Sequence, residues 1–98
     1  MYRIETTALF DLWLTRLRDV TGKAAVIRRL HQAEAGHLGD CKAVGEGVRE
    51  MRIHTGPGYR LFFVQRGDVL LLFLAGGDKG SQQKDIARAL KLAGKCAP

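Results

Sequence analysis

The segment from residue 48 to residue 82 constrains the fold most, because it holds three apolar runs separated by two turn signals. The first turn, Thr55-Gly56-Pro57-Gly58, combines a proline of fixed φ with glycines that tolerate positive φ. The second turn places Gly67 between two further apolar runs. This order predicts an antiparallel meander. The segment is also basic, with cations within or at the ends of its strands: Arg49, Arg52, Arg60 and Lys79.

Alternation along the strands decides which of these cations share a face. Successive side chains of a strand point to opposite faces of the sheet. In the first strand this places Glu50, Arg52 and His54 on one face and Arg49 on the other. In the second strand Arg60 can share the face of Arg52. We therefore expect a helical layer on one face and a concave surface bearing Arg52 and Arg60 on the other.

The sequence patterns on either side of the meander predict mostly helices. Residues 2–5 alternate and predict a short opening strand at a sheet edge. Thr6 or Thr7 can cap a first helix anchored by Trp13, and Thr21 can cap a second. Gly36 is a plausible C-cap of that second helix. Residues 37–47 form a glycine-punctuated connector, residues 69–75 a central strand, and a final helix follows Ser81. The predicted class is α+β: an N-terminal helical hairpin packed on an antiparallel meander sheet, with a C-terminal helix, in a single domain spanning residues 1–98.

The charge of the chain is concentrated in its C-terminal part. Formal net charge is +6 and the sequence pI is about 9.8. Up to Asp40 there are six Lys/Arg and five Asp/Glu, an excess of +1; beyond it there are ten and five, an excess of +5. A one-sided basic surface favours a polyanion such as nucleic acid, although basic charge also serves solubility alone.

Several classes of function are disfavoured. The histidines and carboxylates show no metal-binding or paired-carboxylate spacing, so we expect no metal and no cofactor. Cys41 and Cys96 have no metal-type spacing and read as free thiols of a reducing compartment. No signal peptide or membrane span is apparent, so a cytoplasmic location with no membrane partner is expected.

Cations on one sheet face suit cleavage of RNA by attack of its own 2′-OH on the adjacent phosphorus. This reaction needs no metal, only a proton acceptor, stabilisation of charge on the phosphorane and a donor for the leaving oxygen. Arginine forks hold phosphate, and a lysine can do so too or exchange a proton. The alternative is structural: Arg52 pairs with Glu50 on the same strand face, and Arg60 binds an acidic partner.

Five motifs, which occur in order along the chain, relate the sequence to a known family. They are Phe10-x-x-Trp13-Leu14, Gly39-Asp40-x-Lys42-x-Val44-Gly45-x-Gly47-Val48, Glu50-Met51-Arg52-Ile53, Gly56-Pro57-Gly58-Tyr59-Arg60 and Gly76-Gly77-Asp78-Lys79-x-x-Gln82-x-x-Asp85-Ile86. With them the sequence resembles the RelE/ParE toxin superfamily of bacterial type II toxin–antitoxin modules, specifically the HigB-like addiction module killer proteins. The motifs cover nearly the whole chain, and the last two are the most specific.

The resemblance implies ribosome-dependent cleavage of mRNA, neutralised by a cognate antitoxin that is often a helix-turn-helix protein. By position it assigns catalytic roles to Arg52, Arg60 and Lys79. The tyrosine that stacks on the substrate base in RelE has no counterpart, because Asp85 and Ile86 occupy that region. The auxiliary candidates for the unassigned roles are Glu50, His54 and Gln82, and of these His54 or Glu50 would be the proton acceptor. Candidate RNA-binding cations are Lys42, Lys84 and Arg88.

Two alternatives share the same fold. A ParE-like protein would inhibit DNA gyrase by binding rather than by cleavage. The convergence of Arg52, Arg60 and Lys79 favours RNA chemistry over this reading, because a gyrase binder has no need of cations that meet at one spot. A toxin fold without activity is the other alternative, and the missing tyrosine is what suggests it.

Overall fold

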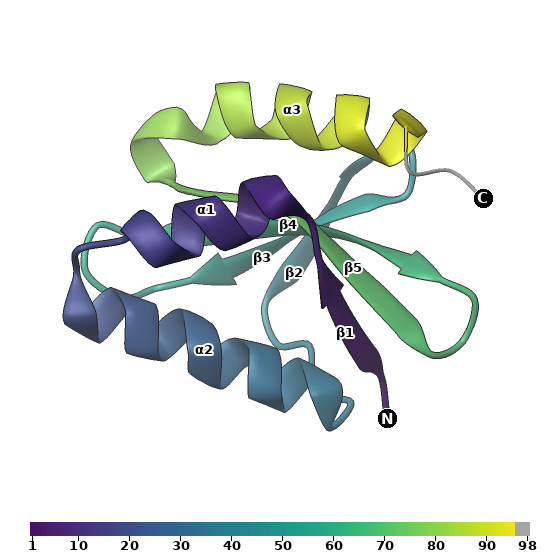
Figure 1. The fold of residues 1–98 in the computed structure, drawn as a ribbon, viewed down its shortest axis with the longest axis horizontal. Helices are drawn as coiled ribbons and strands as arrows, with labels where there is room; N and C mark the ends of the chain where they lie inside the picture. Colours follow the sequence, from purple (N-terminus) through teal and green to yellow (C-terminus); the bar gives the residue numbers. More distant parts are fainter. Residues whose placement is uncertain (96–98) are drawn as a thin grey trace.

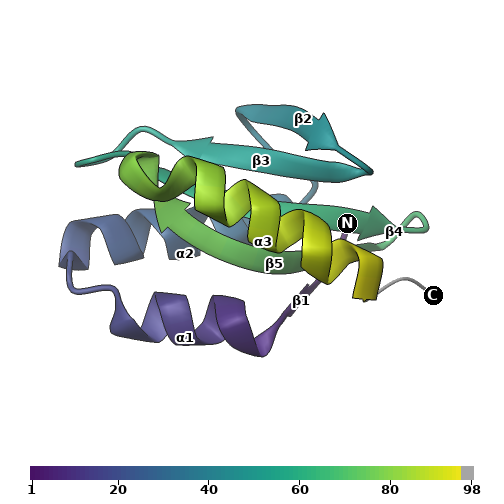
Figure 2. The ribbon, with the colours of Figure 1, turned by 90° about the horizontal axis from the view of Figure 1, so that it is seen from above.

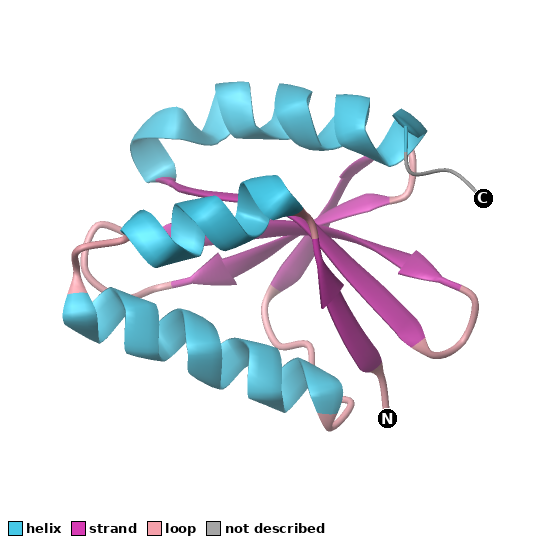
Figure 3. Ribbon diagram, in the orientation of Figure 1, coloured by secondary structure: helices cyan, strands magenta, loops and turns pink. Residues whose placement is uncertain are grey.

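The computed structural model describes residues 1–95, which form three helices and a five-stranded sheet (Figures 1 and 3). The elements in chain order are β1 (Arg3–Thr6), α1 (Ala8–Arg16), α2 (Val20–Glu34), β2 (Cys41–Gly45), β3 (Val48–Ile53), β4 (Tyr59–Arg66), β5 (Leu70–Asp78), a short 3-10 helix (Lys79–Ser81) and α3 (Gln82–Lys95).

The sheet has the order β1-β5-β4-β3-β2 and is mixed. Strands β2 to β5 pair antiparallel in sequence, so the predicted meander is confirmed. The opening strand is also confirmed: β1 lies at the sheet edge and pairs parallel with β5. Between β1 and the first strand of the meander, the chain forms the two helices α1 and α2. The α+β class is confirmed.

Helices cover both faces of the sheet (Figures 1 and 2). Helices α1 and α2 cover one face, and the core beneath them includes Phe10, Met51, Leu61 and Phe73. Helix α3 covers the other face over a second core that includes Phe62. This face was expected to be a concave surface bearing Arg52 and Arg60; both arginines lie on it, and α3 covers part of it. Ala89 and Ala93 of α3 are buried there, and such small side chains allow a helix to approach a sheet closely.

The cap predicted for the first helix is confirmed, whereas the second helix has a different cap from the one predicted. Thr7 caps α1, since its Oγ1 accepts a hydrogen bond from the Phe10 N–H at 3.1 Å. Helix α2 is capped by Asp19 rather than Thr21: an Asp19 carboxylate oxygen accepts from the Gly22 N–H at 3.1 Å. Gly36 follows α2 with φ +101°, a conformation that glycine adopts without strain.

The predicted connector over residues 37–47 contains a strand that sequence reasoning missed. Residues Cys41–Gly45 pair with β3 as an edge strand, and a register shift follows Ala43. The strand is short and mostly exposed, so its sequence lacks a strong apolar pattern. Cys41 has a free thiol, whereas Cys96 lies outside the described residues. No helix within residues 1–95 is long and apolar enough to cross a membrane.

Candidate functional site: a cationic pocket at one end of the hairpin

A pocket of about 320 Å³ lies where the β3–β4 hairpin meets the 3-10 helix. The residues lining it are Arg52, Ile53, His54, Gly56, Pro57, Gly58, Tyr59, Arg60 and Lys79. All three cations assigned from the sequence line this one pocket, and His54 joins them. The Lys79 N–H donates to the Gly58 carbonyl at 3.1 Å, which fastens the 3-10 helix to the hairpin turn.

Arg52 and Arg60 are direct cross-strand partners in the β3–β4 ladder. Like charges placed opposite one another destabilise a sheet unless something compensates them. Here each arginine has its own carboxylate: Arg60 Nη1 lies 3.2 Å from Glu50 Oε1, and Arg52 Nη2 lies 3.0 Å from Asp40 Oδ1. The guanidinium pair is therefore held in place by two separate ion pairs.

Glu50 lies beneath Arg60 and is 1% exposed. Its second oxygen accepts a hydrogen bond from Gln82 Nε2 at 2.8 Å, so both carboxylate oxygens are occupied. The structural alternative, in which Glu50 pairs with Arg52, is not found, because the side chain of Glu50 reaches across to Arg60 on β4 instead. Gln82 is the first residue of α3, and the contact anchors the start of that helix to the site.

Both arginine forks keep donors beyond those used by the carboxylates. The Nε–H groups of Arg52 and Arg60 are buried and have no hydrogen-bond partner within residues 1–95. Because these two atoms are buried, the donors that can meet an anion are those of the Nη groups. Each guanidinium has five donors, so it can bind an anion while retaining its carboxylate partner. The pair is thus suited to a phosphate.

Asp40 was not identified as a site residue from the sequence, although it lies within one of the family motifs. It immediately precedes β2, and its carboxylate contacts two pocket residues, Arg52 through Oδ1 at 3.0 Å and His54 Nε2 through Oδ2 at 2.7 Å. The hydrogen bond with His54, followed by that with Arg52, lowers the pKa of Asp40 from its ordinary value. Asp40 therefore stays ionised at neutral pH.

Tyr59, which was not singled out from the sequence, also lines the pocket, while its ring packs in the core beneath the helical layer. It is 5% exposed, and its hydroxyl donates to Asp19 Oδ2 at 2.7 Å. The same carboxylate caps α2, so this contact joins the helical layer to the start of β4, beside the pocket. The hydrogen bond to Asp19, reinforced by burial, raises the pKa of Tyr59 to about 12.

This shift predicts a pH dependence of stability. A folded-state pKa raised above its unfolded value of 10.0 gives stability that is fully present below pH 10 and lost as the pH rises toward about 12. We expect chemical denaturation to show a falling free energy of unfolding across this interval in the wild type. Tyr59→Phe should be less stable at neutral pH and show a shallower fall in this interval. Identical slopes for the two proteins would contradict the assignment.

The remaining sequence candidates lie outside the pocket. Lys42 is exposed on β2 opposite Glu50, whereas Lys84 and Arg88 are exposed one turn apart on α3. Asp85, in the region where RelE has its tyrosine, is 5% exposed and accepts a hydrogen bond from Ser81 Oγ at 2.5 Å. Burial raises the pKa of Asp85. Asp85 thus fixes the start of α3 and does not line the pocket.

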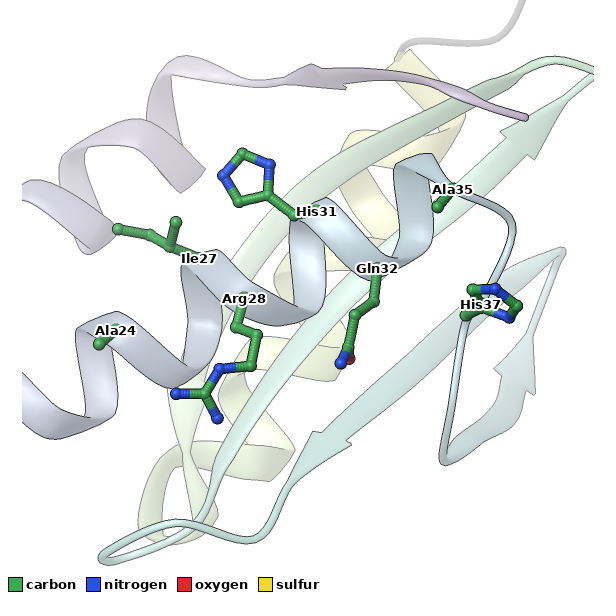
Figure 4. A pocket seen from close by; sticks show the side chains of 7 residues that line it. All are labelled: Ala24, Ile27, Arg28, His31, Gln32, Ala35 and His37. Atoms are coloured by element: carbon green, nitrogen blue, oxygen red, sulfur yellow. The ribbon is translucent and has the colours of Figure 1, made fainter.

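A larger hollow lies on the outer surface of α2 (Figure 4). Its volume is about 590 Å³, and its lining is mainly apolar, with Ala24, Ile27 and Ala35 beside Arg28 and His31. It shares no lining residue with the cationic pocket. Such a surface lacks the convergent charges that phosphate chemistry requires, so the smaller pocket is the candidate site. Within residues 1–95 no cluster of three or more His, Cys, Asp or Glu side chains could hold a metal ion.

Comparisons with known proteins agree on the fold. No protein-family model matches the chain. A Haemophilus influenzae protein described as uncharacterized is 42% identical over 91 residues, which covers 93% of this chain and 92% of that protein.

Three solved structures are similar in fold. A chain of the intact E. coli RelBE toxin–antitoxin complex has a TM-score of 0.61 at 14% identity, covering 80% of this chain and 96% of its own. E. coli YafQ has a TM-score of 0.55 at 18% identity, covering 84% and 98%. The Helicobacter pylori protein HP0894 has a TM-score of 0.55 at 22% identity, covering 82% and 97%. The chain therefore belongs to the same family as the H. influenzae protein and has the RelE-like fold that its sequence resemblance predicts.

Proposed function

We propose that this protein is the toxin of a type II toxin–antitoxin module and that it cleaves mRNA on the ribosome without a metal. The observation that carries the proposal is the convergence of Arg52, Arg60 and Lys79 on one pocket. These residues come from two strands and a 3-10 helix, and a purely structural sheet has little use for three cations at one point. The RelE-like fold and the similarity to a chain of a toxin–antitoxin complex support the proposal.

The reaction begins with in-line attack of the 2′ oxygen on the adjacent phosphorus. The new 2′-O–P bond forms as the bond from phosphorus to the 5′ oxygen breaks, giving a 2′,3′-cyclic phosphate and a 5′-hydroxyl. Arg52 and Arg60 neutralise the non-bridging oxygens, whose charge grows in the transition state. Lys79 is exposed at the rim and makes no ion pair within residues 1–95. It stabilises charge or protonates the leaving oxygen.

His54 is the better proton acceptor of the two nominated from the sequence. Glu50 is buried, and its oxygens are occupied by Arg60 and Gln82, so an RNA hydroxyl cannot reach it. His54 lines the pocket, and its side chain is 74% exposed. When Nε2 donates to Asp40, the Nδ1 atom of a neutral imidazole carries the lone pair that a base needs.

The proposal includes a protein partner. A toxin of this kind is kept inactive by a cognate antitoxin, and similarity to a chain of the RelBE complex supports such a partner here. We expect the adjacent reading frame to encode it, with a helix-turn-helix domain. Co-expression of that frame should restore growth and yield a stable complex on gel filtration.

Two assays run side by side test the target. Primer extension on cellular mRNA after induction should reveal new 5′ ends within coding regions, and purified protein should produce them only when ribosomes are present. A supercoiling assay with purified DNA gyrase should show no inhibition. Gyrase inhibition without new mRNA ends would favour the ParE-like alternative, and neither effect would indicate an inactive fold.

Lys79→Ala gives a test that is free of folding effects, because the Lys79 side chain is exposed. We expect the mRNA cleavage rate to fall by roughly 100-fold or more, the range found when one group that stabilises a transition state is removed. The melting temperature should not change. Lys91→Ala, which removes an exposed lysine of α3 outside the pocket, serves as the matched control. Equal rates for the two variants would remove Lys79 from the mechanism.

A further inference from the structure

We propose that Asp40 is a positioning residue of this site, holding His54 and Arg52 together so that base and phosphate clamp keep a fixed relation. The inference rests on the proposed function. Asp40 does not line the pocket, so it acts through the two residues that do. Its two carboxylate oxygens are divided between them, Oδ1 on Arg52 and Oδ2 on His54.

The backbone places Asp40 so that this division is possible. The Arg52 N–H donates to the Asp40 carbonyl at 2.9 Å, one residue beyond the pairing of Cys41 with Met51. Asp40 therefore extends the β2–β3 ladder beside Arg52. His54 directly follows the end of β3 and lies two positions after Arg52, so both side chains reach the same carboxylate. One carboxylate can thus span both.

An arginine of the helical layer braces the loop that carries Asp40. Arg29 of α2 donates from Nη1 to the Arg52 carbonyl at 2.6 Å and from Nη2 to the Leu38 carbonyl at 2.9 Å. Gly39 lies between Leu38 and Asp40 with φ +70°, and a Cβ there would come within 2.6 Å of the Arg29 guanidinium. The loop is therefore fixed to α2 and β3 on both sides of Asp40, which an ordinary surface ion pair does not require.

The contact between Asp40 and His54 prepares the His54 ring to act as a general base. Because Asp40 accepts a hydrogen bond from His54 Nε2, it selects the tautomer in which Nδ1 is the acceptor. Once Nδ1 has taken the 2′ proton, the adjacent carboxylate stabilises the imidazolium. The charged side chains that line the pocket with His54 are the cations Arg52, Arg60 and Lys79. Asp40 carries the negative charge that contacts the His54 ring.

A mutant cycle in ribosome-dependent cleavage tests the proposal. Asp40→Asn should lower kcat about 10-fold or more while its melting temperature stays near that of the wild type, since general bases contribute about 10²–10⁴-fold. In a His54→Ala background the same substitution should have a much smaller effect, because groups that act as a unit are not additive. Asp40→Glu, which keeps a carboxylate, should recover part of the rate. Asp68→Asn makes the same charge change at an exposed turn and should cleave as the wild type does.

The proposal is overturned if Asp40→Asn cleaves at the wild-type rate, or if it loses the same factor with and without His54. Should Asp40→Asn fail to fold, Asp40→Ala takes its place in the same cycle, and a wild-type rate for that variant overturns the proposal. A second readout does not depend on cleavage: ¹⁵N NMR should show His54 protonated on Nε2 in the neutral wild type and a mixed tautomer in Asp40→Asn. Absence of cleavage by the wild type would refute the proposed function, whereas an unchanged tautomer would refute the Asp40–His54 pairing.

Discussion

Arg60→Ala is expected to abolish growth inhibition and to lower mRNA cleavage by roughly 10²–10³-fold, because it removes a fork from the phosphate pocket. It should also cost stability. Glu50 is 1% exposed and would lose its ionic partner, and breaking a buried pair from one side costs about 3–5 kcal/mol. Cleavage by purified protein and urea denaturation measure the two effects separately.

A second substitution separates loss of function from loss of fold. Arg60→Ala combined with Glu50→Gln leaves no unpaired charge in the interior, and the new amide can still bond with Gln82. We expect the double variant to regain much of the lost free energy of unfolding and to remain inactive. Growth inhibition of wild-type strength by this folded double variant would exclude Arg60 from the reaction.

Phe10→Ala should cause the largest loss of stability at a position remote from the pocket. The ring is fully buried under α1, with its centroid 5.7 Å from that of Phe73 and 5.8 Å from that of Trp13. Emptying such a site costs about 3–5 kcal/mol, because the neighbours relax only partly into the cavity. Domains of this size have only about 5–15 kcal/mol in total. The urea midpoint should therefore fall steeply.

Leu12→Ala supplies the matched control on the same helix. The Leu12 side chain is 46% exposed, so its removal should change the free energy of unfolding by no more than about 0.5 kcal/mol. Comparable losses in the two variants would mean that Phe10 does not pack as described.

The part of the site that the sequence predicts is the part that strand geometry determines. Side chains two residues apart on a strand share a face, and this alternation predicts that Arg52 and His54 lie together, although β3 ends at Ile53 and His54 follows it directly. The hairpin turn then sets the register that places Arg60 opposite Arg52. The fold class followed from the same patterns and from the family resemblance.

What the sequence did not show depends on contacts between distant segments. Asp40 reaches the site because it directly precedes β2, the edge strand that pairs with β3. The sequence of β2 has only a weak apolar pattern, so the alternation of side chains does not predict this pairing. The choice of Asp19 over Thr21 as a helix cap involves a hydrogen bond from Tyr59, which lies 40 positions away. Local patterns also leave open which face α3 covers, and the position of α3 is what buries Glu50 and brings Gln82 to its carboxylate.

The parallel pairing of β1 with β5 has a consequence for the protein during its own synthesis. Arg3–Thr6 leaves the ribosome first, yet its partner is Leu70–Phe73, and Lys79 follows later still. Chains emerge from the N-terminus, so the sheet edge stays unpaired and the pocket incomplete until most of the chain is outside the ribosome. If the target is the translating ribosome, as proposed, the pocket that would act on it is incomplete while most of the chain is still being made.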